Sequence, residues 1–243
     1  MKIYVVGIGP GAKDDLTPRA RQAMADSDLI IGYKTYVELV AELFPEKEFI
    51  ASGMKKEVDR CRLALEKALA GRKVALISSG DSGIYGMAGI MLEIAGQAPR
   101  PVPVEIVPGI TAASAAAALA GAPLMHDFAV ISLSDLLTPW EAIRKRIECA
   151  AQGDFVVCFY NPKSTQRTEQ IVAAREILLQ FKEADTPVSI VRNVGRPGEN
   201  VVLTTLDKML EHPIDMFTVI IVGNSQSYLA GGKMITPRGY AVG

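Results

Sequence analysis

Apolar runs alternate with amphipathic stretches along the first half of the chain. Buried strands are predicted at residues 3–8, 29–33, 49–51, 74–77 and 102–107. A helix is predicted at residues 57–70, with Val58, Cys61, Leu65, Ala68 and Leu69 on its apolar face and Gly71 ending it. Thr17 and Pro18 indicate another helix start, because threonine is a good N-cap and proline suits the first helical position.

The pattern pauses at the Gly-Ala-Pro of residues 121–123 and then restarts. Further strands are predicted at residues 128–133, 155–160, 188–191, 201–203 and 217–222. Thr138-Pro139 repeats the Thr-Pro helix start, and a long polar helix is predicted at residues 165–182. The sequence therefore predicts two α/β domains with mostly parallel or mixed sheets, at residues 1–122 and 123–243.

Composition narrows the class of protein. The chain has 243 residues, of which 49% are hydrophobic and 22% charged, and its net charge is −1. These values are typical of a globular protein and give no electrostatic footprint for nucleic acid. Residues 106–126 are uncharged, but they are mainly small residues with Pro108 and Pro123 near the ends, so we expect a loop and a tightly packed helix rather than a membrane span.

The sparse cysteines and histidines predict no metal site. Three cysteines and two histidines have no recognised metal-ligand spacing. Cys158 lies inside an apolar run, which is typical of a buried free thiol and favours a reducing cytoplasm. The first strand begins at Ile3, so we expect no signal peptide before it.

Three glycine-containing loops carry the strongest functional signal. They are Val-Gly-Ile-Gly-Pro-Gly at residues 6–11, Ser-Gly-Asp-Ser-Gly-Ile-Tyr-Gly at residues 79–86 and Pro-Gly-Ile-Thr-Ala at residues 108–112. Each follows a predicted strand, and glycine lets backbone N–H groups approach a ligand closely. We therefore expect the three loops side by side at the carboxyl edge of one sheet, where open α/β sheets bind small molecules.

The first loop alone leaves a dinucleotide-binding oxidoreductase open as an alternative. Gly7, Gly9 and Ala12 satisfy the fingerprint G-x-G-x-x-G/A. That fingerprint also needs an acidic residue after the second strand, where Lys34 stands, and Pro10 removes an N–H donor. A non-catalytic binding module with the same loops is a further alternative.

Taken in order, the three loops resemble those of the tetrapyrrole methylases, and the resemblance covers essentially the whole chain. Further stretches resemble the C(17)-methylating members of that family in the cobalamin pathway, and they lie at residues 32–36, 121–128, 131–140, 158–162 and 234–240. Those members methylate C(17) of precorrin-3B or cobalt-factor III and contract the macrocycle. Ser82 stands where siroheme-branch relatives carry proline, which indicates a different tetrapyrrole substrate.

The resemblance implies a cytoplasmic homodimer with S-adenosylmethionine (SAM) in a cleft between the two domains. It assigns to the cofactor Pro10, Gly80, Asp81, Ile84, Thr111, Ala112, Tyr160, Asn193, Val194, Thr236 and Pro237. Asp81 is the only acid in the three loops and could receive the ammonium or ribose hydroxyls of SAM. Its structural alternative is a turn residue in a glycine-rich loop.

Substrate and catalytic residues follow from the chemistry that this reaction needs. Ring contraction needs proton transfer and stabilised oxyanion charge, for which His126, Ser132 and Asp135 are candidates, with a hinge histidine and an ordinary loop as alternatives. Candidates to bind the polycarboxylate macrocycle are Lys34, Lys55, Lys56, Arg60 and Tyr85, followed by Lys163 and Arg167. For any one of these cations, solvated surface charge is the alternative.

Overall fold

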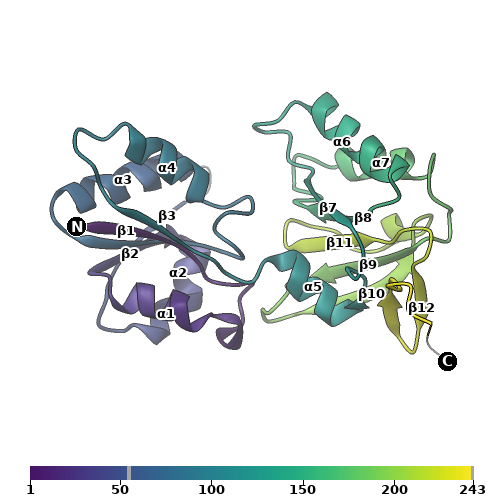
Figure 1. Ribbon diagram of the computed structural model, residues 1–243, viewed down its shortest axis with the longest axis horizontal. Helices are drawn as coiled ribbons and strands as arrows, with labels where there is room; N and C mark the ends of the chain where they lie inside the picture. Colours follow the sequence, from purple (N-terminus) through teal and green to yellow (C-terminus); the bar gives the residue numbers. More distant parts are fainter. Residues whose placement is uncertain (54–55, 242–243) are drawn as a thin grey trace. The chain divides into compact units, whose positions relative to one another are not determined.

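The structure, a computed structural model, describes residues 1–53 and 56–241. The chain divides into two compact units, Met1–Ala112 and Ala113–Gly243. Each unit is built around its own sheet with helices packed on it (Figure 1). The predicted α/β class is confirmed.

The first unit holds a five-stranded parallel sheet in the order β3-β2-β4-β1-β5. The strands are β1 (Lys2–Gly7), β2 (Leu29–Tyr33), β3 (Glu48–Ser52), β4 (Lys73–Ser78) and β5 (Val104–Val107). Each overlaps a predicted apolar run. Such runs form strands here because both faces of the sheet are buried under helices.

Two pairs of helices cover the two faces of this sheet (Figure 1). On one face α3 (Glu57–Leu69) and α4 (Ala88–Gly96) pack against the strands, and on the other α1 (Pro18–Ala25) and α2 (Lys34–Val40) do so. Thr17 is the N-cap of α1, and its hydroxyl accepts from the Ala20 N–H at 3.1 Å, as predicted. The helix α2 was not predicted, because it follows β2 without a linker.

The buried face of α3 differs from the predicted one. Val58 is 44% exposed, while Arg60 is only 5% exposed. The Arg60 guanidinium donates to the Ser52 hydroxyl at 2.9 Å and the Gly53 carbonyl at 2.8 Å, and it pairs with Glu57 at 3.1 Å. Arg60 is therefore not a solvated surface charge, because its donors hold the end of β3.

The second unit holds a mixed five-stranded sheet in the order β10-β9-β11-β8-β7. Its strands are β7 (Phe128–Ser132), β8 (Val156–Tyr160), β9 (Pro187–Arg192), β10 (Asn200–Thr205) and β11 (Thr218–Val222). Only β7 and β8 run parallel as neighbours, and the other pairs are antiparallel. Figure 1 draws α6 (Trp140–Gln152) and α7 (Glu169–Leu178) on one side of this sheet and α5 (Ala112–Ala120) on the other.

The remaining elements are short. A three-stranded sheet joins β12 (Tyr228–Ala230), β13 (Lys233–Ile235) and β6 (Gly121–Ala122). Single 3-10 turns lie at Lys13–Asp15, Ala41–Leu43 and Met209–Glu211. The helix predicted at residues 165–182 is present only as the shorter α7.

Two predicted boundaries need correction. The unit boundary lies at Ala112 rather than residue 122, because β6 pairs with β13 and the Lys233 ammonium donates to the Leu119 carbonyl at 3.1 Å, which ties α5 to the second unit. Thr138 is not an N-cap. Pro139 is extended, its carbonyl accepts the first helical N–H bonds, and α6 begins at Trp140.

An ion pair between a buried lysine and a partly exposed aspartate lies at the end of the second sheet where β8 begins. The Lys182 side chain is 2% exposed, and its ammonium lies 3.3 Å from an Asp154 carboxylate oxygen and 3.0 Å from the Phe155 carbonyl. Burial lowers the pKa of Lys182 against the attraction of Asp154. Burial alone would raise the pKa of Asp154, but hydrogen bonds from Ser225 and the attraction and hydrogen bond of Lys182 together outweigh it, so that this pKa is lowered.

The three cysteines are free, and two of them are buried. Burial raises the pKa of both the Cys61 and the Cys158 thiol to about 12, so each acts as an apolar core side chain. Within residues 1–53 and 56–241, every helix is too short or too polar to cross a membrane.

Candidate active site

The three glycine loops meet at the carboxyl edge of the first sheet. They follow β1, β4 and β5, which are neighbouring strands. Gly9 and Gly80 form a two-way backbone bridge, with N···O distances of 3.1 Å and 2.7 Å. The Ser82 hydroxyl donates to the Val107 carbonyl at 3.2 Å and links the second loop to the end of β5. The predicted grouping of the loops is confirmed.

Gly7 and Gly109 are required by the close approach of the loops. A Cβ on Gly7 would lie 2.7 Å from the Gly109 nitrogen and 2.8 Å from the Gly80 oxygen. A Cβ on Gly109 would lie 2.3 Å from the Gly80 oxygen and 2.6 Å from the Gly7 oxygen. Since all these atoms are backbone, no rotamer change relieves the clash. The segments where the three loops begin are therefore packed tightly against one another.

Asp81 has the role of a turn residue. One carboxylate oxygen accepts from the Gly83 N–H at 2.8 Å, and the other accepts from the Gly109 N–H at 2.9 Å. The side chain therefore closes its own loop and bonds it to the third loop. A carboxylate oxygen has two lone pairs, so these bonds leave acceptor capacity for a ligand.

The other first-unit candidates lie around the same contact. A Cβ on Gly80 would come within 4 Å of the backbone of Thr111 and Ala112, so these three predicted residues are brought together. Pro10 is buried and follows the Gly9 bridge. Ile84 and Tyr85 form the tip of the second loop and are 39% and 57% exposed. Tyr85 has φ +52°, a conformation that costs energy for an aromatic residue.

In the second unit, Ser132, Tyr160 and Asn193 share one edge of the sheet. They lie at the carboxyl ends of β7, β8 and after β9, and β9 runs parallel to β8. The Tyr160 hydroxyl accepts from the Ala113 N–H at 2.7 Å and so satisfies a donor in the first turn of α5. Asn193 has φ +54°, and the Val194 beside it is buried.

Sequence reasoning missed Asn161 at this edge. Its φ is +50°, and its side-chain amide donates to the Ser132 hydroxyl at 3.0 Å. The Ser132 hydroxyl also accepts from the Ser134 N–H at 3.2 Å. Asparagine tolerates the left-handed conformation, so an asparagine between the end of a strand and Pro162 was the available signal.

Thr236 and Pro237 follow the small sheet. Thr236 is 1% exposed, its hydroxyl lies 2.7 Å from that of Ser227, and its N–H donates to the Ala122 carbonyl at 3.1 Å. These bonds fix the segment that leads into Pro237.

The structure does not bring the catalytic candidates together, because His126 precedes β7 whereas Ser132 ends it and Asp135 follows it. The His126 side chain is 46% exposed, and one ring nitrogen accepts from the Asp127 N–H at 3.0 Å. Asp135 accepts from the Gln170 side-chain amide at 2.7 Å. His126 is exposed rather than partly buried, so it remains accessible to a ligand.

The basic substrate candidates also differ. Lys34 is exposed at the first position of α2, and Lys56 pairs with Asp59 at 3.2 Å. Lys55 lies outside the described residues. Lys163 is half-buried. Arg60 already bonds within its own unit, as described above.

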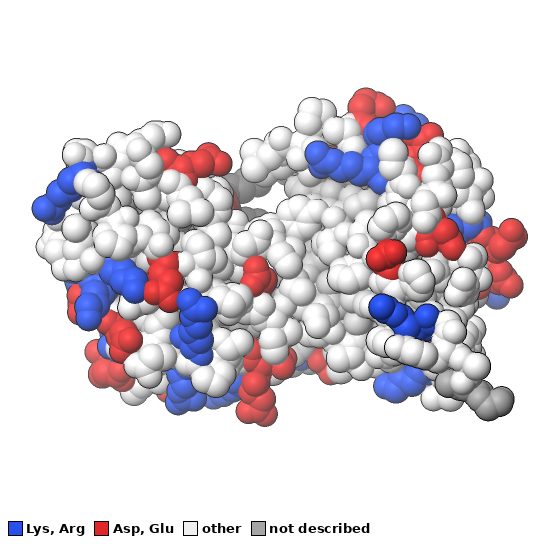
Figure 2. Space-filling model, viewed as in Figure 1, with Lys and Arg blue, Asp and Glu red and all other residues white. Residues whose placement is uncertain are grey.

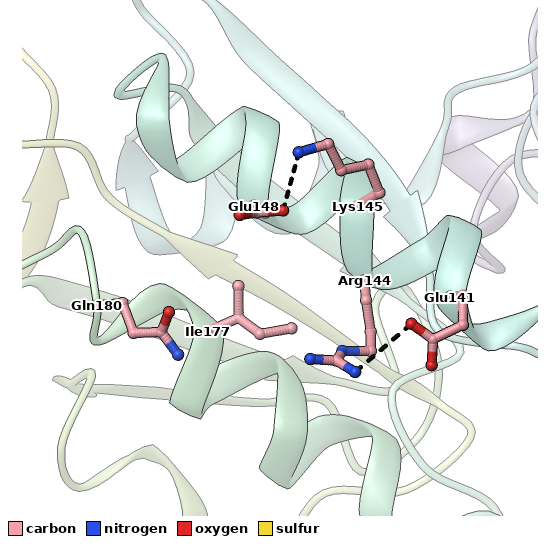
Figure 3. Close-up of a pocket in the computed structure, with 6 residues that line it drawn as sticks. All are labelled: Glu141, Arg144, Lys145, Glu148, Ile177 and Gln180. Atoms are coloured by element: carbon pink, nitrogen blue, oxygen red, sulfur yellow. Dashed lines mark hydrogen bonds and ion pairs between the residues drawn. The ribbon is translucent and has the colours of Figure 1, made fainter.

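Charged side chains elsewhere form mixed surfaces. Figure 2 shows Lys or Arg beside Asp or Glu on the drawn face of each unit. A groove of about 360 Å³ lies between α6 and the end of α7 (Figure 3). There Arg144 pairs with Glu141 at 3.5 Å and Lys145 pairs with Glu148 at 3.0 Å, so these charges are compensated within α6.

The chain matches a known protein family over most of its length. The model of the Tetrapyrrole (Corrin/Porphyrin) Methylases matches residues 2–210. The chain belongs to the tetrapyrrole methylases. This membership rules out the nicotinamide-dependent oxidoreductase, because the first glycine loop is part of the methylase pattern.

Individual methylases are similar over the whole chain. The cobalt-factor III methyltransferase of Priestia megaterium is 52% identical over 98% of this chain, which spans only 45% of that relative's length. The probable cobalt-factor III C(17)-methyltransferase of Salmonella typhimurium is 50% identical over 99% of this chain and 100% of that protein.

A solved structure agrees with the fold. The crystal structure of the methyltransferase CobJ is 39% identical and has a TM-score of 0.91, covering 97% of this chain and 99% of that chain. The predicted methylase fold is therefore confirmed.

Proposed function

We propose that this protein transfers a methyl group from SAM to C(17) of cobalt-factor III and contracts the macrocycle to give cobalt-precorrin-4 in cobalamin biosynthesis. The observation that carries this proposal is the 50% identity over the full length of the Salmonella relative named for that reaction. The metal-free substrate precorrin-3B, giving precorrin-4, and methylation at another ring position are the alternatives within the same family.

The first-unit loops suit a ligand that is held largely by backbone. Gly80, Thr111 and Ala112 lie together. Because glycine has no side chain, the backbone N–H and C=O groups of this loop can be approached closely by a ligand. We assign SAM to Pro10, Gly80, Asp81, Ile84, Thr111 and Ala112, and in the second unit to Tyr160, Asn193, Val194, Thr236 and Pro237. When bound, SAM supplies a methyl group already activated on a sulfonium.

Methyl transfer needs little from the protein beyond the positioning of SAM and the acceptor carbon. Ring contraction needs groups that move protons and stabilise negative charge on oxygen. His126 can donate a proton at its second ring nitrogen, since the first accepts from the Asp127 N–H and the neutral ring then carries its proton on the second. We propose His126, which precedes β7, as the acid–base group. Ser132 and Asp135, which lie at the other end of that strand, are proposed to stabilise charge on oxygen there.

The substrate carries carboxylate arms, which we assign to cations of the first unit. Lys34, Lys55 and Lys56 are the candidates, with Tyr85 stacking on the ring. Arg60 bonds to the end of β3, so we expect it to act by holding that segment.

The test is incubation of the purified protein with SAM and cobalt-factor III. We expect S-adenosylhomocysteine, a product heavier by one methyl group, and the absorption change of a contracted ring. Mass increase without the absorption change would indicate methylation at another position. Absence of S-adenosylhomocysteine with either cobalt-factor III or precorrin-3B would refute the proposal and favour a binding module.

We further propose that the protein works as a cytoplasmic homodimer. The buried free thiols of Cys61 and Cys158 suit a reducing compartment. Sedimentation of the purified protein tests the subunit count, and a monomer at micromolar concentration would contradict the dimer.

A further inference from the structure

Two pairs of exposed apolar side chains lie at the carboxyl edge of the second sheet. Leu136 and Leu137, in the loop after β7, are 64% and 90% exposed. Met216 and Phe217, directly before β11, are 38% and 54% exposed. They share an edge because β11 runs antiparallel to β8 while β7 runs parallel to it. Exposed apolar side chains gathered in this way mark a binding surface rather than a core.

A half-buried cation lies beside Met216 at this edge. An Arg167 terminal nitrogen donates to the Asn161 carbonyl at 2.6 Å and contacts the Met216 sulfur at 3.7 Å. The Asp135 carboxylate, next to Leu136 in the chain, attracts the same guanidinium. The cation is therefore held in place at the edge rather than extended into water.

Two buried polar atoms in this cluster have no hydrogen-bond partner among the described residues. They are Nε of Arg167 and the side-chain oxygen of Gln170, whose amide nitrogen donates to Asp135. Buried polar groups are almost always hydrogen-bonded, so the unpartnered Nε–H of Arg167 indicates that an acceptor belongs beside it.

We propose that this edge patch, formed by Leu136, Leu137, Met216, Phe217 and Arg167, binds one face of the tetrapyrrole substrate. The inference rests on the proposed function and adds a second-unit contact to it. A tetrapyrrole has a wide apolar face and carboxylate arms at its rim, which match the exposed apolar side chains and the fixed guanidinium at this edge. The apolar pairs contact the macrocycle, and Arg167 binds one rim carboxylate.

The experiment compares Leu137→Ser and Arg167→Gln with the control variants Leu92→Ser and Arg144→Gln, which change exposed residues on α4 and α6. Binding of cobalt-factor III is measured by absorption titration, and binding of SAM by calorimetry. We expect Leu137→Ser to raise the tetrapyrrole Kd by about tenfold, the loss expected for one exposed leucine that becomes buried. Arg167→Gln should raise KM more than it lowers kcat and should weaken the salt dependence of binding.

Both patch variants should bind SAM like the wild type, and both controls should bind cobalt-factor III like the wild type. If the wild type binds and methylates cobalt-factor III while the patch variants stay within twofold of it, this inference is wrong and the proposed function stands. If the patch variants instead lower the sedimentation mass with tetrapyrrole binding intact, the patch is a contact with a second copy. If the wild type binds no tetrapyrrole, the proposed function itself fails, and this inference fails with it.

Discussion

Replacing Gly109 with alanine would place a methyl group inside the backbone of two neighbouring loops. Its Cβ would lie 2.3 Å from the Gly80 oxygen and 2.6 Å from the carbonyl carbon and oxygen of Gly7. Overpacking of this kind costs about 1–3 kcal/mol, and because only backbone surrounds the site we expect about 3 kcal/mol. The matched control is Gly89→Ala in α4, where a Cβ meets nothing within 4 Å. Alanine in a helix should stabilise the control by about 0.5–1 kcal/mol.

The two variants should therefore differ by about 4 kcal/mol in the free energy of unfolding of the first unit. Urea unfolding followed by circular dichroism measures this difference, and calorimetry with SAM measures the consequence for the cofactor. We expect Gly109→Ala to lose SAM affinity by at least tenfold and Gly89→Ala to keep it. A Gly109→Ala protein as stable as the wild type, with unchanged SAM affinity, would show that the loops are not packed on one another as described.

Three further predictions concern single side chains. Asp81→Ala removes the acceptor that joins two loops, so the protein should lose about 1–3 kcal/mol of stability and bind SAM more weakly, as measured by urea unfolding and calorimetry. His126→Ala should still give methylated material but contract the ring about 10²-fold more slowly, with mass spectrometry reporting the first step and absorption the second. Asp154→Asn leaves Lys182 buried without its carboxylate and should cost about 2 kcal/mol at neutral pH, allowing for the partly exposed carboxylate. The lowered pKa of Asp154 means that its contribution is full above pH 3.8 and is lost as the pH falls through the folded-state value, so this variant and the wild type should converge in acid.

The strands could be predicted because their signal is local. A run such as that of β2 is apolar at successive positions, and burial on both faces of a parallel sheet requires this. The Thr-Pro dipeptide shows the limit of such signals. It begins α1, where the Thr17 hydroxyl reaches the Ala20 N–H, but at residues 138–139 the proline itself is the extended cap and the helix starts later. Proline fixes its own φ angle but not its ψ angle, and ψ decides whether the proline lies inside the helix or before it.

The contacts that build the candidate site could not be predicted, because they join residues distant in the chain. The sequence does not show that the Asp81 carboxylate accepts from the Gly109 N–H at 2.9 Å, 28 residues further along, in addition to any contact with a ligand. Arg60 is predicted as a substrate-binding cation, with surface charge as the alternative, because helical spacing does not show that its guanidinium reaches back to Ser52 and Gly53. Spacing identifies which face of a helix is buried on average, whereas hydrogen-bond partners decide whether one long side chain joins it.

The shared contact of Gly7, Gly80 and Gly109 also limits how this methylase could be redesigned. Replacing one of the three loops with that of another methylase would change the backbone path at one of these glycines. The backbone of the other two loops packs against that glycine and could not adjust to the change. The segments around Gly7, Gly80 and Gly109 must therefore be exchanged together or left unchanged. The tip residues Ile84 and Tyr85 protrude from this frame, with exposed fractions of 39% and 57%. A library intended to redirect methylation to another ring carbon should vary the tip and keep the glycine base intact.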